Sequence, residues 1–226
     1  MNSEFVVRPY TGNETIFFVL ILMYLIVYVL QYYFPGRLSE FSLRILAFQT
    51  TERNFGARRS DEWVAQLLTS MVTTVGFALF LFALWVLFYP DAVNFNTPLA
   101  LLAIGLLVQM FFMMRYGVVK LLSSTAGAEN LGDQYFSLYT SFGFMLSIVL
   151  AALALPIFFL PVNQQVWVFL GLAIWGLSFL LRVAKTGMLG LSASGIPFKY
   201  LLLYICTLEI LPVAVLVKYL YSRLNG

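Results

Sequence analysis

The chain has 226 residues, of which 62% are hydrophobic and 10% are charged, and its formal net charge is +3. Soluble domains are nearer 45–50% apolar and about 25% charged, so a water-soluble fold with this composition would lack the polar surface to cover itself. The apolar runs are continuous and about twenty residues long, which favours membrane-spanning helices over the short alternating segments of a transmembrane barrel. We predict an all-α, polytopic membrane protein that forms one integral membrane domain over residues 1–226.

Six apolar runs are long enough to cross a bilayer. In chain order we predict spans at about 15–34, 64–89, 98–120, 135–160, 166–185 and 198–221. The first run is too long for a signal-peptide core and no small-residue cleavage site follows it, so we expect it to be retained as a span. Residues 123–134 and 186–197 are rich in small and polar residues, and we predict that both are loops.

A different pattern follows the first span, at residues 37–48. Its apolar residues recur at helical spacing and share one face: Leu38, Phe41, Ile45 and Phe48. Charged residues fall on the opposite face: Arg37, Glu40 and Arg44. This pattern predicts a helix lying flat in the headgroup region. The alternative is an ordinary helical linker packed on the protein.

The basic residues also predict an orientation. The first, third and fifth connections carry ten Lys and Arg residues in total, whereas the other side of the membrane carries three. Short cytoplasmic loops collect Lys and Arg. We therefore expect both termini outside the cytoplasm and the amphipathic segment inside it.

One carboxylate interrupts the last apolar run. Glu209 is the only acidic residue between Pro197 and Leu224. An acid at bilayer depth costs about 2.5–3.5 kcal/mol on insertion scales, which indicates a sheltering partner or a functional role. Pro212 lies three residues later and removes a backbone donor, which loosens the carbonyl of Leu208 and predicts a kink.

Two readings of Glu209 remain open. It is either a structural contact that locks helices together, or a proton or cation site. The first choice of partner is Arg115 together with Gln109, both on the third span. Arg182 is a second candidate, although an arginine near the end of a span also serves as an interfacial anchor.

The chain lacks the residue types on which several kinds of chemistry depend. The chain has no histidine and a single cysteine, Cys206, so neither a metal site nor a disulfide is expected. Met110, Met113 and Met114 could ligate soft copper, but packing is the better explanation because no cysteine or histidine accompanies them. We predict no catalytic residues, no cofactor and no nucleic-acid partner.

The stretch Tyr200-Leu-Leu-Leu-Tyr-Ile-Cys-Thr-Leu-Glu-Ile-Leu-Pro, followed by Lys218, resembles the C-terminal signature of an uncharacterised family. The members are multi-pass inner-membrane proteins of Bacteroidetes-type bacteria that carry a domain-of-unknown-function label. The resemblance implies a bacterial inner membrane and a family-level role for Glu209 and Pro212. It implies no known reaction.

Three functions follow as hypotheses. The first is a non-catalytic membrane subunit or scaffold whose partners are the lipid bilayer and other membrane proteins, because the loops leave no room for a catalytic domain. The second is a small proton- or ion-coupled transporter or channel built around Glu209. The third is an enzyme of lipid chemistry at the cytoplasmic interface that uses Arg58, Arg59 and Asp61.

Overall fold

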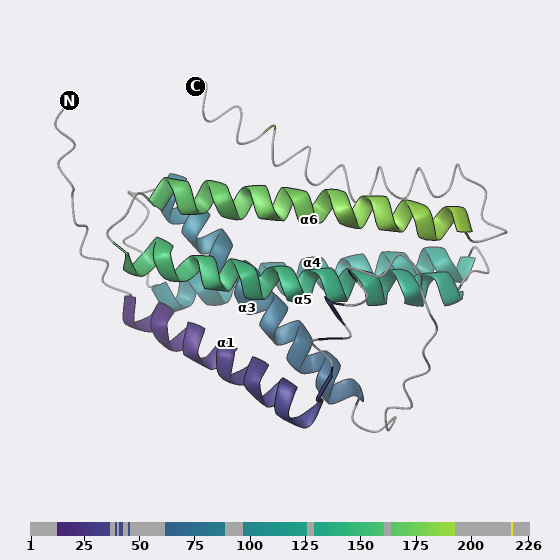
Figure 1. Cartoon of the computed structure of the whole chain (residues 1–226), viewed down its shortest axis with the longest axis horizontal. Coiled ribbons are helices and arrows are strands. Elements are labelled where there is room, and N and C mark those ends of the chain that lie inside the picture. The colour runs from purple at the N-terminus through teal and green to yellow at the C-terminus, as the bar shows by residue number, and fades with distance from the viewer. Residues whose placement is uncertain are drawn as a thin grey trace. The chain divides into compact units, whose positions relative to one another are not determined.

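The computed structural model describes residues 13–36, 39, 41, 42, 45, 62–88, 97–125, 129–160, 164–192 and 218 (Figure 1). Five long helices account for almost all of these residues, which contain no strand. The helices are α1 (Asn13–Tyr33), α3 (Glu62–Phe88), α4 (Thr97–Thr125), α5 (Glu129–Phe159) and α6 (Gln164–Ser192). The prediction of an all-α fold is confirmed over this part of the chain.

All five helices are long and apolar enough to cross a membrane, by length and composition. They correspond to the first five predicted spans. The sixth predicted span, 198–221, lies outside the described residues. So does most of the predicted amphipathic helix, of which Ser39, Phe41, Ser42 and Ile45 are described and helical.

The predicted loops at 123–134 and 186–197 are partly wrong. Helix α4 continues to Thr125, α5 begins at Glu129, and α6 continues to Ser192. Gly187 lies inside α6. A single glycine costs a helix only about 1 kcal/mol, so glycine content alone does not end it.

The described helices divide into two compact units. The first unit lies within Met1–Phe111 and Thr140–Gly176, and the second lies within Phe112–Tyr139 and Leu177–Gly226. Helices α4, α5 and α6 each contribute to both units.

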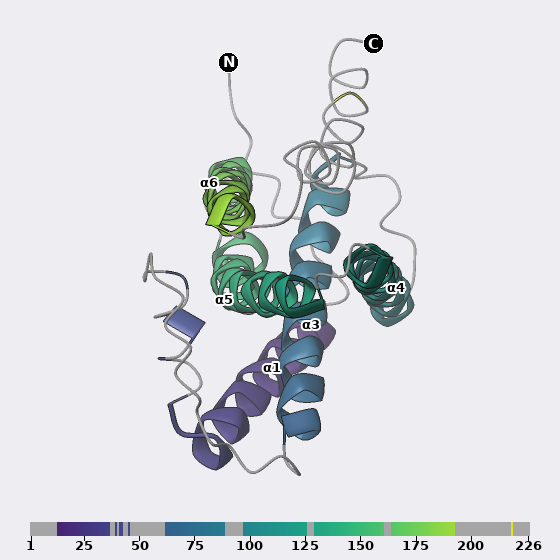
Figure 2. The same ribbon diagram turned by 90° about the vertical axis from the view of Figure 1, so that its right-hand side faces the viewer.

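In the first unit, α1 and α3 lie side by side (Figures 1 and 2). Helix α1 buries a stripe of residues three, four or seven apart in the sequence, which is the spacing of one helical face. The stripe comprises Ile16, Leu20, Met23 and Leu30. It joins a core to which α3, α4, α5 and α6 contribute Leu79, Leu101, Phe144 and Val168, among others.

Two glycines let helices approach closely within this unit. A Cβ added at Gly76 of α3 would lie 2.5 Å from the carbonyl oxygen of Ser147 on α5. A Cβ added at Gly171 of α6 would lie 2.3 Å from the Cε2 atom of Phe80 on α3. Small residues at such crossings are typical of membrane helices, because close backbone approach maximises van der Waals contact in lipid.

Candidate functional site

Arg115 of α4 is a buried charged residue of the second unit. Only 6% of its surface is exposed. Its Nη2 atom donates a hydrogen bond to the hydroxyl of Tyr135, which lies near the start of α5. Its guanidinium carbon also lies 4.3 Å from the ring centroid of Tyr139, one turn further along α5. Burial, a hydrogen bond and a ring contact together hold this side chain in one place.

Arg182 of α6 contacts the same ring. Its guanidinium carbon lies 4.8 Å from the Tyr139 centroid. The rings of Tyr135 and Tyr139 are themselves stacked, with centroids 6.3 Å apart and planes 17° from parallel. Cation–π contacts at such distances are worth about 0.5–2 kcal/mol, depending on desolvation. Arg115, Arg182, Tyr135 and Tyr139 are called the Arg–Tyr cluster below.

Bringing two cations to one ring has an electrostatic cost. Because both distances are measured to the Tyr139 centroid, the two guanidinium carbons are at most about 9 Å apart. At an effective dielectric constant of about 20, two unit charges at that separation repel by about 2 kcal/mol. The second unit as a whole carries seven Lys and Arg residues but only three Asp and Glu residues in its sequence. The Arg–Tyr cluster thus brings two positive charges to one aromatic ring.

The residues of the cluster lie at similar distances along the helices that carry them. Arg115 lies 18 residues after the start of α4, and Arg182 lies 18 residues after the start of α6. At 1.5 Å per residue, each is about 27 Å along its own helix. Tyr139 lies 20 residues before the end of α5, or about 30 Å. All three residues therefore lie about 27–30 Å from the opposite ends of their helices, a length close to the thickness of a bilayer's hydrocarbon core, about 30 Å.

Other basic residues lie one or two turns beyond this level. Lys120 of α4 has its Nζ atom 5.9 Å from the ring of Tyr116, whose ring is 4.6 Å from that of Phe136 on α5. Lys185 follows Arg182 by three residues on α6, which places both on the same side of the helix. These side chains add positive charge on the side of the cluster nearer the helix ends.

A second polar contact lies in the first unit. The Oε1 atom of Gln109 accepts hydrogen bonds from the hydroxyl of Thr74 at 2.6 Å and from the hydroxyl of Ser70 at 3.3 Å. Gln109 is close to the middle of α4, and both hydroxyls come from α3. Side-chain hydrogen bonds of this kind hold membrane helices together. The structure thus gives Gln109 a role between α3 and α4.

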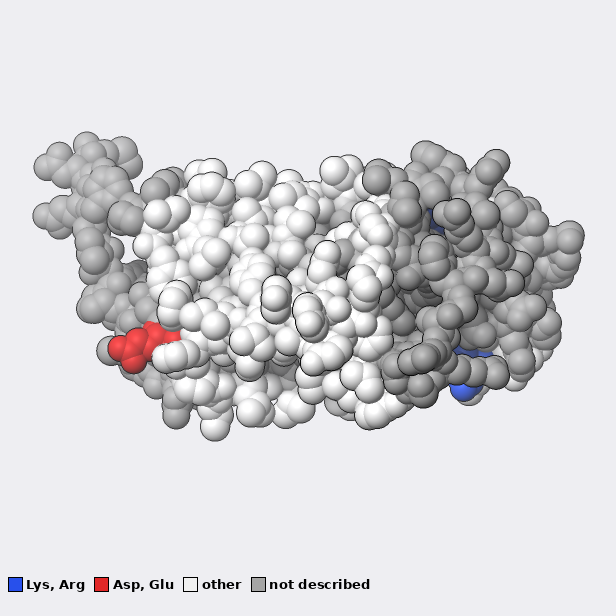
Figure 3. All heavy atoms as spheres, turned by 60° about the horizontal axis from the view of Figure 1, so that its bottom comes forward, with Lys and Arg blue, Asp and Glu red and all other residues white. Residues whose placement is uncertain are grey.

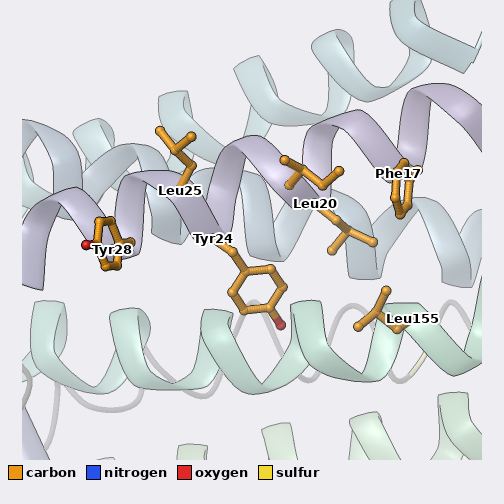
Figure 4. Close-up of a pocket in the computed structure, with 7 residues that line it drawn as sticks. Phe17, Leu20, Tyr24, Leu25, Tyr28 and Leu155 are labelled. Carbon is orange, nitrogen blue, oxygen red and sulfur yellow. The ribbon is translucent and has the colours of Figure 1, made fainter.

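An open, apolar groove of about 400 Å³ runs along α1 (Figure 4). Residues of α1 line it together with Leu155 of α5, and the phenol of Tyr24 points toward α5. The remaining lining residues are Phe17, Leu20, Ile21, Leu25 and Tyr28. Such a lining offers a surface to acyl chains and provides no residue for catalysis.

Charged residues are scarce over the described surface. The face drawn in Figure 3 is almost wholly uncharged where it is described. Within the described part of the chain, no group of three or more His, Cys, Asp or Glu residues could hold a metal ion.

Several predicted site residues lie outside the described residues. These are Glu209, Pro212, Leu38, Arg44 and Phe48. The pairing of Glu209 with Arg115 and Gln109 therefore stays a prediction. From the predicted amphipathic helix, Phe41 is described and is 5% exposed, with its ring centroid 5.1 Å from that of Phe144 on α5. Such a contact is the one expected of a linker packed on the protein.

The tyrosines of the cluster were not singled out from the sequence. Tyr135 and Tyr139 are four residues apart at the start of an apolar run, a spacing that puts both on one helical face. That spacing, together with an arginine in each of two other spans, was the sequence signal from which the cluster could have been predicted.

Comparison with known proteins gives a family and no activity. No curated protein and no solved structure matches the chain. A family model described as Domain of unknown function (DUF4271) matches residues 16–220, which is most of the chain, and the chain therefore belongs to this family of unknown function.

Proposed function

We propose that this chain is a non-catalytic membrane subunit or scaffold of a protein complex, in which Glu209 makes a buried contact with another helix or with a partner. The proposed setting is the inner membrane of a Bacteroidetes-type bacterium, with both termini in the periplasm. The Arg–Tyr cluster carries the proposal. Arg115 is 6% exposed and is held by side chains of α5, so a charged residue already takes part in helix packing here, and the same kind of role is proposed for Glu209, the acid of the last apolar run.

The described side chains favour a structural role over a catalytic one. Arg115 is held by a hydrogen bond to Tyr135 and by the ring of Tyr139, so it is positioned rather than presented to a cleft. The described surface has large exposed apolar side chains along α1, α4 and α6, which suit lipid or other membrane helices.

The test is neutralisation of Glu209 in the native host. The Glu209→Gln variant is expressed under its own promoter, solubilised in a mild detergent, and analysed by size exclusion and by identification of co-purifying proteins. We expect loss of the co-purifying proteins or of the folded chain, because the variant removes the charge of the proposed buried contact. The matched control is Asp133→Asn, which removes a carboxylate two residues before Tyr135 and is expected to leave the assembly intact.

Two results would count against the proposal. Wild-type chain recovered from its host only as a single monodisperse species would argue against a complex. A Glu209→Gln variant that assembles normally but loses proton or cation flux in reconstituted vesicles would favour the alternative, a proton- or ion-coupled transporter. A charge exchange, Arg115→Glu with Glu209→Arg, should restore assembly if the two side chains are partners.

A further inference from the structure

We propose that the groove along α1 binds a membrane-soluble quinone, a planar ring with carbonyl oxygens on an apolar tail, and that the hydroxyl of Tyr24 donates a hydrogen bond to one of those oxygens. The groove is lined by residues of α1 and by Leu155 of α5, all of which lie in the first unit. The proposal concerns binding and no reaction, and it does not depend on Glu209 or on a partner protein.

The hydroxyl of Tyr24 is a hydrogen-bonding group that stands ready for a ligand. The ring of Tyr24 is half-buried against the core of the first unit, and the phenol points toward α5 (Figure 4). Among the described residues, no donor or acceptor contacts its oxygen, and the oxygen is not sealed inside the protein. A polar group in an apolar environment is stabilised by a hydrogen bond, so this hydroxyl favours a ligand that brings an acceptor.

The position of Tyr24 along α1 selects among ligands. Tyr24 is 11 residues after the start of α1 and 9 before its end, which places it about 16 Å and about 14 Å from the two ends. In the proposed membrane setting this is the middle of the bilayer. The ester and phosphate oxygens of a phospholipid lie near the bilayer surface, so its acyl chains would bring no acceptor to Tyr24. A quinone is apolar enough to enter the hydrocarbon core and carries its acceptors with it.

Aromatic rings lie at both ends of the groove (Figure 4). Phe17 packs edge-on against Phe159 of α5 with ring centroids 6.0 Å apart, and Tyr28 stacks on Tyr32 with centroids 6.4 Å apart. Rings that are already held in place lose little conformational freedom when a ligand binds. A planar ring gains from stacking or edge contacts with aromatic side chains, whereas a flexible chain gains only from burial. The lining therefore suits a planar ring with an apolar tail.

The size of the groove favours a small molecule over a helix of another chain. Its volume of about 400 Å³ is within the range of about 300–1,000 Å³ that is usual for ligand sites. It is lined by 7 residues, whereas a stable interface between two proteins involves about 20–30 residues on each side. From Phe17 to Tyr28 the groove follows α1 for about 16 Å, so it can hold the ring together with the first part of the tail.

The experiment uses the full chain purified in a neutral detergent at a fixed concentration. It is titrated with decylbenzoquinone and, separately, with decylbenzene, which has the same tail on a ring without carbonyl groups. Isothermal titration calorimetry measures binding, and circular dichroism follows thermal unfolding. We expect decylbenzoquinone to bind with saturation and to raise the unfolding temperature by several degrees, because a ligand of the native state stabilises it. Decylbenzene should bind about fivefold more weakly, since it offers no acceptor to Tyr24.

The Tyr24→Phe variant tests the hydrogen bond, because it removes the hydroxyl and keeps the ring. It should bind decylbenzoquinone about fivefold more weakly and decylbenzene as the wild type does. Without ligand it should be no less stable than the wild type, because no described residue pairs with the hydroxyl. The matched control is Tyr32→Phe, which removes a hydroxyl from the same helix outside the groove lining and should leave both affinities unchanged.

The Leu155→Trp variant tests the place of binding. Leu155 is 39% exposed, so a larger side chain can be accommodated there, and it would fill the groove from the side of α5. Both ligands should lose most of their affinity for this variant.

Five results would overturn the inference. Equal affinity of Tyr24→Phe and the wild type for decylbenzoquinone would show that the hydroxyl takes no part. Lower stability of ligand-free Tyr24→Phe would give the hydroxyl a structural role instead. Equal affinity of the wild type for the two ligands would show that hydrocarbon contacts suffice, so that acyl chains occupy the groove. Unchanged binding in Leu155→Trp would place the quinone elsewhere. A wild-type dimer in size exclusion that Leu155→Trp dissociates would assign the groove to a second copy of the chain.

Discussion

The crossing of α3 and α5 at Gly76 offers a sharp test of the packing. An alanine at this position would place its Cβ 2.5 Å from the carbonyl oxygen of Ser147 and 2.9 Å from its carbonyl carbon. Both atoms belong to the backbone of α5, so no side-chain rotation relieves the contact. The two helices must move apart by about 1 Å to restore ordinary van der Waals distances of about 3.5 Å.

The change in the free energy of unfolding is the cost of overpacking minus the gain in helix propensity. Overpacking of a well-packed interior costs about 1–3 kcal/mol, and separating α3 from α5 also loosens Phe144 and its neighbours in the core. Replacing a helical glycine by alanine returns about 1 kcal/mol through helix propensity. We therefore expect Gly76→Ala to lower the free energy of unfolding by up to about 2 kcal/mol relative to the wild type, and by about 1–3 kcal/mol relative to a glycine-to-alanine change without a clash.

The assay is unfolding of the purified chain by increasing fractions of sodium dodecyl sulfate in mixed micelles, followed by tryptophan fluorescence. Gly117→Ala is the matched control, because a Cβ at Gly117 meets nothing within 4 Å and only the gain in helix propensity remains. The control should unfold at the same or a higher detergent fraction. If Gly76→Ala is as stable as Gly117→Ala, the close approach of α3 and α5 is not as described.

Two further predictions concern contacts inside the first unit. A double-mutant cycle of Gln109→Leu and Thr74→Val should give a coupling of about 0.6 kcal/mol and no more than about 1.7 kcal/mol in the same unfolding assay, and a value of zero would contradict their hydrogen bond. Gly171→Ala should be destabilised by the ring of Phe80, and Phe80→Leu in the same chain should recover most of the loss because the clash is with a side chain. By contrast, adding Ser147→Gly to the Gly76→Ala variant should not restore its stability, because the clash is with the backbone of α5. Recovery of stability in that double variant would contradict a backbone clash.

The positions of the helices were predictable and their ends were less so. Hydropathy locates a span because burial of twenty apolar residues in lipid outweighs local preferences. The ends depend on much smaller terms. Residues 129–134 and 186–192 are polar or glycine-containing and were expected to be loops, yet they extend α5 and α6. Differences of about 1 kcal/mol per residue in helix propensity are too small to stop a helix that is already formed.

The candidate site was predictable only in part. Its polar residues can be found in the sequence, but the contacts between them depend on how the helices pack. Arg115, Arg182 and Gln109 stand out because polar residues are rare in apolar runs. Their contacts could not be read from the sequence. Arg115 and Tyr139 are 24 residues apart, and Arg182 is another 43 residues along the chain, so the ring they share depends on how three helices pack. The expected pairing of Gln109 and Arg115 with Glu209 lies outside the described residues, and the hydrogen bonds of Gln109 with Ser70 and Thr74 were not foreseen.

In the proposed membrane setting, the equal spacing of the two arginines from the starts of their helices would also set how deeply those helices insert. A slide of α4 or α6 by one turn, about 5.4 Å, toward the bilayer centre would carry a guanidinium into hydrocarbon and cost about 2.5–3.5 kcal/mol. A slide of the same size in the other direction would bring leucines and valines from the opposite end into water. In the proposed membrane setting, the arginines would therefore oppose movement of α4 and α6 along the bilayer normal, and a membrane of different thickness would be accommodated by helix tilt or by deformation of the lipid layer.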